Sequence, residues 1–297
     1  LFTSLVWVYT AFVHHIRRRN TLVDTVDDSQ LPFVSVLIPA YREEEVISKT
    51  LDAVLKINYP AFEVIVINDG SPDQTVDQIR PFLSDPRLRL IDKHVNEGKA
   101  MALNDALPCA RGELVLIMDA DALPDPQVIR AMIPHFRYPR VGAVAGNPRV
   151  RNATNLLTRL QVIEFSSVIG LMRRAQRIWG RVMCISGVVG MFRKSAIIDA
   201  GLFTPGMATE DIDLTWKLQR KFYDVRYEAK ALVWMIVPDT LGSWWKQRKR
   251  WALGLGQVLR RHSTLLGDWR YRRMYPLDRK STRLNSSHIT ISYAVFC

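Results

Sequence analysis

Two carboxylates follow an apolar run in the segment LVLIMDADALPD, residues 114–125. Five apolar residues lead directly into Asp119, and a single alanine separates it from Asp121. Two like charges this close raise each other's pKa unless a positive charge lies between them. Carboxylate oxygens suit hard divalent ions, so the pair predicts a site for Mg²⁺ or Mn²⁺. A solvated turn after a strand is the plainer alternative, because Asp is common in turns.

Polar residues also follow two other apolar runs. FVSVLIP (33–39) leads to Tyr41 and Glu43, and FEVIVINDGS (62–71) contains Asp69 near its end. In open α/β sheets, ligands bind beyond the carboxyl ends of the strands. We therefore expect these side chains to share one sheet edge with Asp119 and Asp121.

The elements between these ends alternate. Strand-like runs lie at 33–39, 62–71, 87–92, 113–121 and 141–146, and helix-like segments at 43–57, 73–83, 98–107 and 126–137. This alternation predicts an α/β fold, with a mainly parallel sheet and helices on both faces. Neither GxGxxG nor GxxxxGK[ST] follows the first strand, which argues against a dinucleotide fold and a P-loop.

The second half of the chain differs in pattern. Residues 154–178 are typical of a long amphipathic helix, 184–196 are rich in small residues, and 243–261 predict a basic, Trp-rich helix. The segment 207–222 predicts a helix with Thr209 as its N-cap and acid in its first turn. These acids could serve only the helix terminus, and 243–261 could simply lie on a membrane surface.

Taken together, these segments resemble a known family. The similarity rests on VLIPAYREE, INDGS, NEGKAMALN, DAD, TED and the Q-x-x-R-W pattern of residues 247–251, in this order and spacing. Over about residues 34–276 the chain resembles the processive family 2 glycosyltransferases, which implies a nucleotide-sugar-binding fold of GT-A type over 33–240. The segments 146–152, 160–180 and 209–219 are most similar to the poly-β-1,6-N-acetylglucosamine synthases of bacterial biofilms. Cellulose, chitin and hyaluronan synthases share the core motifs, so the sugar stays open.

The resemblance implies a donor site for a UDP-sugar, most readily UDP-GlcNAc. Tyr41, Glu43 and Asp69 would hold the uridine, although Asn68 stands where many relatives have a second Asp. Lys99 would approach the diphosphate or uracil side of the nucleotide, although alone it could be an ordinary lysine on a helix surface. The two carboxylates of DAD would position the nucleotide-sugar and bind Mg²⁺ or Mn²⁺.

The resemblance also implies the machinery for inverting, processive transfer to a growing β-linked polysaccharide. Asp211 would be the general base, with Glu210 as the next candidate. Arg250 would supply positive charge suited to phosphate, and Trp251 a ring face for a sugar. Gln247 would be the third substrate-binding residue of the Q-x-x-R-W pattern.

The composition is consistent with a globular protein that has an anionic partner. The 297 residues carry a net charge of +12 and are 48% hydrophobic. Such a charge favours nucleic acid, a phosphorylated substrate or an acidic membrane surface. The three cysteines show no CxxC spacing, so we expect neither a zinc site nor a disulfide framework.

The ends of the chain predict contact with a membrane. Residues 1–20 are apolar and then basic, as at the inner end of a truncated transmembrane helix, and 241–277 would form an interfacial region. We therefore expect a catalytic domain facing the cytoplasm at the bacterial inner membrane, with a small membrane subunit as a further candidate partner. Residues 278–297 have no pattern linked to what precedes them and are interpreted as a non-native tail.

Two other classes of protein share some of these features. In a haloacid-dehalogenase-type phosphatase a DxD pair ends the first strand, with Thr or Val two places after the second Asp. Here the pair ends the fourth strand, and Leu123 occupies that place. A non-enzymatic basic module, which would bind a membrane or nucleic acid, is the second alternative, but no nucleic-acid-binding motif is present. Metal-dependent UDP binding would distinguish the transferase from both.

Overall fold

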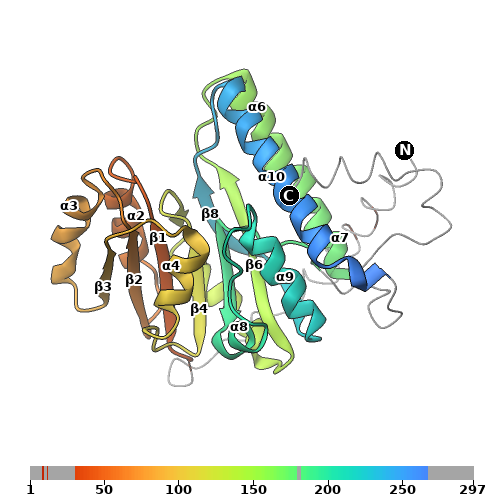
Figure 1. Cartoon of the computed structure of the whole chain (residues 1–297), viewed down its shortest axis with the longest axis horizontal. Helices are drawn as coiled ribbons and strands as arrows, with labels where there is room; N and C mark the ends of the chain where they lie inside the picture. The colour runs from red at the N-terminus through yellow and green to blue at the C-terminus, as the bar shows by residue number, and fades with distance from the viewer. Residues whose placement is uncertain (1–8, 10–11, 13–30, 179–181, 267–297) are drawn as a thin grey trace.

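The computed structural model describes residues 31–178 and 182–266, together with Tyr9 and Phe12 (Figure 1). Its centre is a single sheet with the strand order β3-β2-β1-β4-β7-β6-β8-β5. The strands are β1 (Val34–Ala40), β2 (Phe62–Asp69), β3 (Leu88–Lys93), β4 (Leu114–Met118), β5 (Leu123–Pro124), β6 (Val141–Val150), β7 (Val189–Arg193) and β8 (Asp224–Met235).

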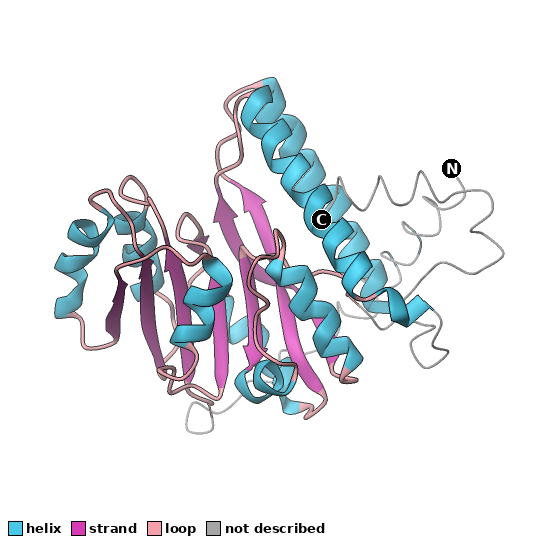
Figure 2. Ribbon diagram, in the orientation of Figure 1, coloured by secondary structure: helices cyan, strands magenta, loops and turns pink. Residues whose placement is uncertain are grey.

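Helices cover both faces of this sheet (Figure 2). They are α2 (Ile47–Leu55), α3 (Thr75–Ile79), α4 (Lys99–Ala106), α5 (Val128–Met132), α6 (Leu156–Ile163), α7 (Gly170–Ile178), α8 (Lys194–Asp199), α9 (Glu210–Arg220) and α10 (Leu241–Arg261). Shorter turns are η2 (Arg80–Ser84), η3 (Ile133–Arg137), the π-helical η4 (Glu164–Ile169) and η5 (Ser263–Leu266). The helix expected at 43–57 begins only at Ile47, because residues 43–46 form a turn.

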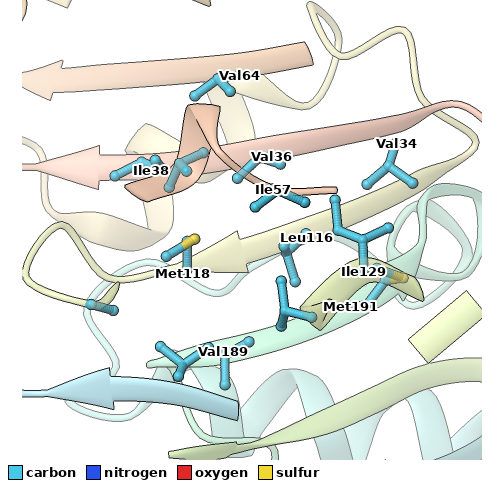
Figure 3. Close-up of a cluster of buried hydrophobic side chains, with 14 of the residues drawn as sticks. Val34, Val36, Ile38, Ile57, Val64, Leu116, Met118, Ile129, Val189 and Met191 are labelled. Atoms are coloured by element: carbon cyan, nitrogen blue, oxygen red, sulfur yellow. The ribbon is translucent and has the colours of Figure 1, made fainter. Parts of the chain in front are cut away.

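Alternate residues of the strands build two cores. Val36 and Ile38 of β1 belong to the cluster that packs against α2 and α5 (Figure 3). Leu37, between them, belongs to the opposite cluster, which includes side chains of α4, α8 and α9. Both faces of β1 and β4 are therefore apolar, which explains why these strands are nearly continuous hydrophobic runs in the sequence.

The first half of the sheet is parallel, as predicted. Strand β1 pairs in parallel with β2 and β4, and β2 pairs in parallel with β3. The carboxyl ends of β1, β2 and β4 thus meet at one edge, where Asp69 at the end of β2 and Asp119 directly after β4 line the same cavity on either side of β1. This arrangement confirms the expectation that the acidic strand ends share one edge of the sheet.

The expectation of a mainly parallel sheet is wrong for the second half, where the sheet is mixed. Strand β7 is antiparallel to both β4 and β6, and β5 is antiparallel to β8, while β6 and β8 are parallel. The reason is the small-residue-rich segment 184–196, which contains the five-residue strand β7. This strand is inserted between β4 and β6, and strand direction is not encoded in hydrophobic periodicity.

Within the amphipathic segment 154–178, residues 156–178 form one helical rod, α6–η4–α7, and α10 lies alongside it (Figure 1). Asn155 begins the rod with a capping box, because it exchanges hydrogen bonds with Thr158 of 2.8 and 3.0 Å. Among the described residues, none of the helices combines the length and apolar character that a membrane span requires. The transmembrane end expected at 1–20, apart from Tyr9 and Phe12, and the tail expected at 278–297 lie outside the described residues.

Candidate active site

A cavity of about 430 Å³ lies beyond the carboxyl ends of β1, β2 and β4. Its lining includes every site residue expected from the sequence: Tyr41, Glu43, Asp69, Lys99, Asp119, Asp121, Glu210, Asp211, Gln247, Arg250 and Trp251. The loops after the strands supply its floor, while α9 and α10 supply the opposite wall. The structure thus brings together residues separated by 210 positions (41 to 251), and their individual roles stay predictions.

Carboxylates crowd the floor of the cavity. Burial, together with the negative charge of Asp119, raises the pKa of Asp121 to about 6. Burial, Asp121 and Asp119 raise the pKa of Glu43 to about 7. Burial is the larger cause of both shifts, and the part that comes from neighbouring carboxylates is charge repulsion that a bound cation would relieve.

Lys99 connects the two sides of the cavity. Its ammonium group forms an ion pair with Asp119 on the floor and lies 3.6 Å from Oε1 of Glu210 on α9. Burial acts to lower the pKa of Lys99, but the charges of Asp119 and Glu210 outweigh burial and raise it. Lys99 therefore stays charged, and its position inside the cavity excludes the alternative of an ordinary surface lysine.

The position of Lys99 depends on Asp69. The Asp69 carboxylate accepts hydrogen bonds from the amides of Glu97 (3.2 Å) and Gly98 (2.7 Å). Gly98 has φ of +87° and directly precedes Lys99, the first residue of α4. Asp69 thus fixes the start of α4, a structural function that the sequence did not reveal. Lys93 lies 3.4 Å from the same carboxylate.

Asp211 is held by two backbone amides. Its Oδ2 accepts a hydrogen bond of 2.7 Å from Gly187, and its Oδ1 accepts one of 2.8 Å from Ile212. Burial and the nearby charge of Glu210 nevertheless raise the pKa of Asp211 to about 6. A carboxyl group with a pKa near 6 is ionised at neutral pH and is a stronger proton acceptor than an ordinary Asp, as a general base requires.

Thr209 precedes α9, as expected, but its side chain makes no capping hydrogen bond. The side chain packs instead against α10, since an added Cβ on Gly254 would lie 2.3 Å from Thr209 Oγ1. The backbone of α10 thus approaches the start of α9 closely. Glu210 and Asp211 of α9 line the cavity, so these acids do not serve only the helix terminus.

Arg248 anchors the Q-x-x-R-W segment on the side away from the cavity. It occupies a position of the pattern where any residue is allowed. Arg248 is 5% exposed and forms two hydrogen bonds, of 2.6 and 2.7 Å, with Glu164 in the π-helical turn. Its guanidinium group lies 4.5 Å from the ring centre of Trp251 and 5.5 Å from that of Trp244. This contact orients Trp251 toward the cavity that Gln247 and Arg250 also line.

The lining also includes residues that the sequence did not indicate as site residues, among them Ser186, Gly187, Met235 and Ile236. The small side chains in the segment 184–196 were the available signal for the first two, because Gly in a loop often marks the close approach of other groups. The latter two follow from the end of β8 and carry no chemical signature in the sequence.

The carboxylates fit a divalent cation as part of a site completed by substrate. Asp119 and Asp121 offer hard oxygen ligands, and their crowding is relieved by a cation. Within the part of the chain that the structure describes, no three His, Cys, Asp or Glu side chains form a preformed metal site. A bound ion would therefore take its remaining ligands from water and from phosphate oxygens, as Mg²⁺ commonly does.

Residues 35–201, more than half of the chain, match glycosyl transferase family 2. The chain belongs to this family. The phosphatase alternative is thereby removed, in agreement with a first strand that ends without an acid. The matched segment contains the strands β1, β2 and β4 and the donor-side residues, whereas α9 and α10 follow it.

Relatives with similar sequences are named as polysaccharide synthases. The chain is 41% identical over 266 residues to a poly-beta-1,6-N-acetyl-D-glucosamine synthase of Staphylococcus epidermidis and 40% identical to that of Staphylococcus aureus. In both cases 88% of this chain is covered but only 65% of the relative. The chain thus spans slightly less than two thirds of these synthases.

Solved structures support the fold. A mannosyltransferase from Pyrobaculum calidifontis, in complex with GDP-Man and Mn²⁺, is similar with a TM-score of 0.70 and 24% identity, covering 88% of this chain and 74% of that protein. TarS of S. aureus, in complex with UDP-GlcNAc, is similar with a TM-score of 0.55 and 17% identity, covering 88% and 79%. At these identities the likeness concerns the fold alone, and it agrees with the predicted GT-A type.

Proposed function

We propose that this protein transfers N-acetylglucosamine from UDP-GlcNAc, with inversion and processively, to the end of a growing β-linked exopolysaccharide. The observation that carries the proposal is the single cavity in which donor-side acids (Asp119, Asp121) face an activated carboxylate (Asp211). The 41% identity to a poly-beta-1,6-N-acetyl-D-glucosamine synthase supports this sugar over glucose. A cellulose-, chitin- or hyaluronan-type synthase is the alternative, and the donor panel below separates the cellulose type, which would use UDP-glucose.

The reaction is a single displacement. An acceptor hydroxyl between Asp211 and the donor attacks the anomeric carbon, and the bond from that carbon to the diphosphate oxygen breaks. Asp211 takes the proton of the hydroxyl, and UDP leaves with the electron pair of the broken bond. The configuration at the anomeric carbon is thereby inverted. Because no covalent intermediate forms on the enzyme, no nucleophilic side chain is needed.

Fixed charge stabilises the departing diphosphate. Lys99 lies at the floor of the cavity and Arg250 on the α10 wall, so two cations of the chain flank the space for the leaving group. Asp119 and Asp121 would hold Mg²⁺ or Mn²⁺, which when bound would act as a Lewis acid toward the diphosphate. Trp251 offers an apolar ring face for the acceptor sugar, and Tyr41 and Glu43 border the space for the nucleoside.

We further propose that α6 and α10 rest on the cytoplasmic face of the bacterial inner membrane. Exposed apolar side chains recur at helical spacing on α6 (Leu156, Leu160, Ile163) and on α10 (Leu241, Trp245, Leu253), and Trp245 is 66% exposed. Exposed Lys246 and Lys249 lie on the same α10 segment. Basic and apolar groups on one helix favour an anionic lipid surface. A growing polysaccharide and a small membrane subunit are the further partners we propose.

The test is turnover of a panel of UDP-sugars by the chain in detergent or membranes with Mg²⁺. We expect UDP release and polymer of high molecular mass with UDP-GlcNAc, and far less of both with UDP-glucose. Preferential use of UDP-glucose would move the protein to the cellulose-type alternative. Flotation with anionic vesicles tests the membrane proposal. Replacing Leu156, Leu160 and Trp245 with Ser should reduce lipid binding, whereas UDP binding in the absence of vesicles should be unchanged.

A further inference from the structure

A buried joint connects α9, which carries Glu210 and Asp211, to α10, which carries the Q-x-x-R-W residues. The Thr209 side chain contacts α10 at Gly254, and the amide of Ala208 donates a 2.9 Å hydrogen bond to Oε1 of Gln257. At the far end, Nε2 of His262 lies 2.9 Å from Oδ1 of Asp213. Gly254 and His262 are eight positions apart, which places them on one face of a helix.

Asp213 is the centre of this joint. Its side chain is fully buried, and it accepts a 2.6 Å hydrogen bond from the hydroxyl of Thr204 besides the contact with His262. Lys217 and Arg261 lie 3.7 and 3.5 Å away. Burial acts to raise the pKa of Asp213, but these hydrogen bonds outweigh burial and lower it. The carboxylate is thus charged, and its burial depends on these partners.

Both ring nitrogens of His262 have a charged partner. Nδ1 of His262 lies 3.5 Å from a guanidinium nitrogen of Arg220, which can only donate. Nε2 faces the Asp213 carboxylate, which can only accept, so His262 donates to Asp213 through Nε2. The ring is 1% exposed and also packs 5.7 Å from the Trp216 ring centre. His262 is consequently held in position between Asp213, Arg220 and Trp216.

We propose that Asp213 and His262 are positioning residues that set the register of α10 along α9, and hence the separation of Asp211 from Arg250. Asp213 lies two residues after Asp211, and His262 directly follows the last residue of α10, so one contact ties both helices. A helix is stiff along its axis, so a shift at His262 displaces Arg250 as well. The proposal rests on the function proposed above, because it explains how Asp211 and Arg250 are held at the separation that the sugar transfer requires.

Three variants test the joint in the full chain. His262→Leu removes the donor, whereas His262→Gln keeps an amide hydrogen that can reach Asp213. Gly254→Ala leaves both residues in place and pushes the helices apart through the contact with Thr209. The matched control is His135→Leu, because His135 is also a buried histidine on a carboxylate, 2.8 Å from Glu228, but lies away from the cavity.

The measurements are kcat with UDP-GlcNAc, the dissociation constant of UDP with Mg²⁺, and the melting temperature. We expect His262→Leu and Gly254→Ala to lower kcat about tenfold or more, since misplacement by about 1 Å can cost about 10²-fold. UDP affinity should stay within about threefold, and His262→Gln should recover most of the rate. His135→Leu should lower the melting temperature without this loss of kcat.

A kcat for His262→Leu equal to that of the unchanged chain would overturn the proposal. The proposal would also be overturned if His135→Leu lost kcat together with stability. The loss of kcat in His262→Leu could then follow from destabilisation alone. A distance between spin labels at residues 221 and 249 reads the register without turnover, and we expect it to shift or broaden in Gly254→Ala and His262→Leu only. An inactive parent chain would count against the proposed function, whereas an unchanged label distance counts against the joint itself.

Discussion

The amide of Gly187 donates a 2.7 Å hydrogen bond to Oδ2 of Asp211, and the carbonyl of the same glycine lies 3.4 Å from Nζ of Lys99. A Cβ on Gly187 would lie 3.0 Å from Nζ of Lys99 and 3.3 Å from Oδ2 of Asp211. The backbone of one glycine therefore spaces the predicted base from the cation that serves the leaving group.

The first prediction is that Gly187→Ala lowers kcat about tenfold or more, because the added methyl group must displace Lys99 or Asp211. The check is steady-state turnover of UDP-GlcNAc. Gly256→Ala is the matched control, since nothing lies within 4 Å of a Cβ at that position. Equal rates for the two variants would show that the spacing is unimportant.

The second prediction is that Asp211→Asn lowers kcat by about 10²–10⁴-fold, because the amide keeps the shape of the side chain but cannot take the proton. UDP binding should be nearly unchanged, since Asp211 lies on the wall opposite the donor. Glu210→Gln serves as the comparison and should lose less. A larger loss in Glu210→Gln than in Asp211→Asn would reassign the base to Glu210.

The third prediction concerns pH. Asp211 acts only when ionised and its pKa is raised to about 6, so kcat/KM at saturating Mg²⁺ should fall as the pH drops through about 6. Glu210 is one cause of the raised pKa, so Glu210→Gln should move this acid limb to lower pH. The measurement is a pH–rate profile between about pH 5 and 8. A limb at the same pH in both proteins contradicts the assignment.

The fourth prediction is that Asp121→Asn abolishes the part of UDP affinity that depends on Mg²⁺ or Mn²⁺. The amide is a weaker ligand, and the substitution removes one charge from the crowded pair. Calorimetric titration with UDP, with and without a chelator, measures this part directly. If Asp121→Asn kept the metal-dependent gain of the unchanged chain, the ion would have to bind elsewhere.

The fifth prediction is that Glu164→Gln destabilises the fold by about 3 kcal/mol, because it leaves a buried guanidinium group without its charge partner. Lys56→Ala is the contrasting case, since the Lys56–Asp52 pair is solvent-exposed and such pairs contribute about 0–1 kcal/mol. Denaturant unfolding of both variants provides the comparison. Similar free energies of unfolding for the two would mean that the Arg248–Glu164 pair adds little to stability.

The sequence by itself determined the parallel half of the sheet and the chemistry at its edge. Continuous apolar runs form strands buried on both faces, and parallel strands bring their carboxyl ends together, so Asp69 and the Asp119–Asp121 pair lie at one edge of the sheet. The motif order also sufficed to indicate the family. These features are local in the chain or follow from general rules of connection.

Only the tertiary structure decided how α9 and α10 close the cavity. It also decided the direction of β7. Three contacts that hold the site join residues 24 to 84 positions apart: Gly187–Asp211, Arg248–Glu164 and Asp213–His262. Periodicity identifies the buried face of a helix but not its partner or its register along that partner. The fit of side chains sets that register, as where Gly254 admits Thr209, and such fit exists only once the helices have packed.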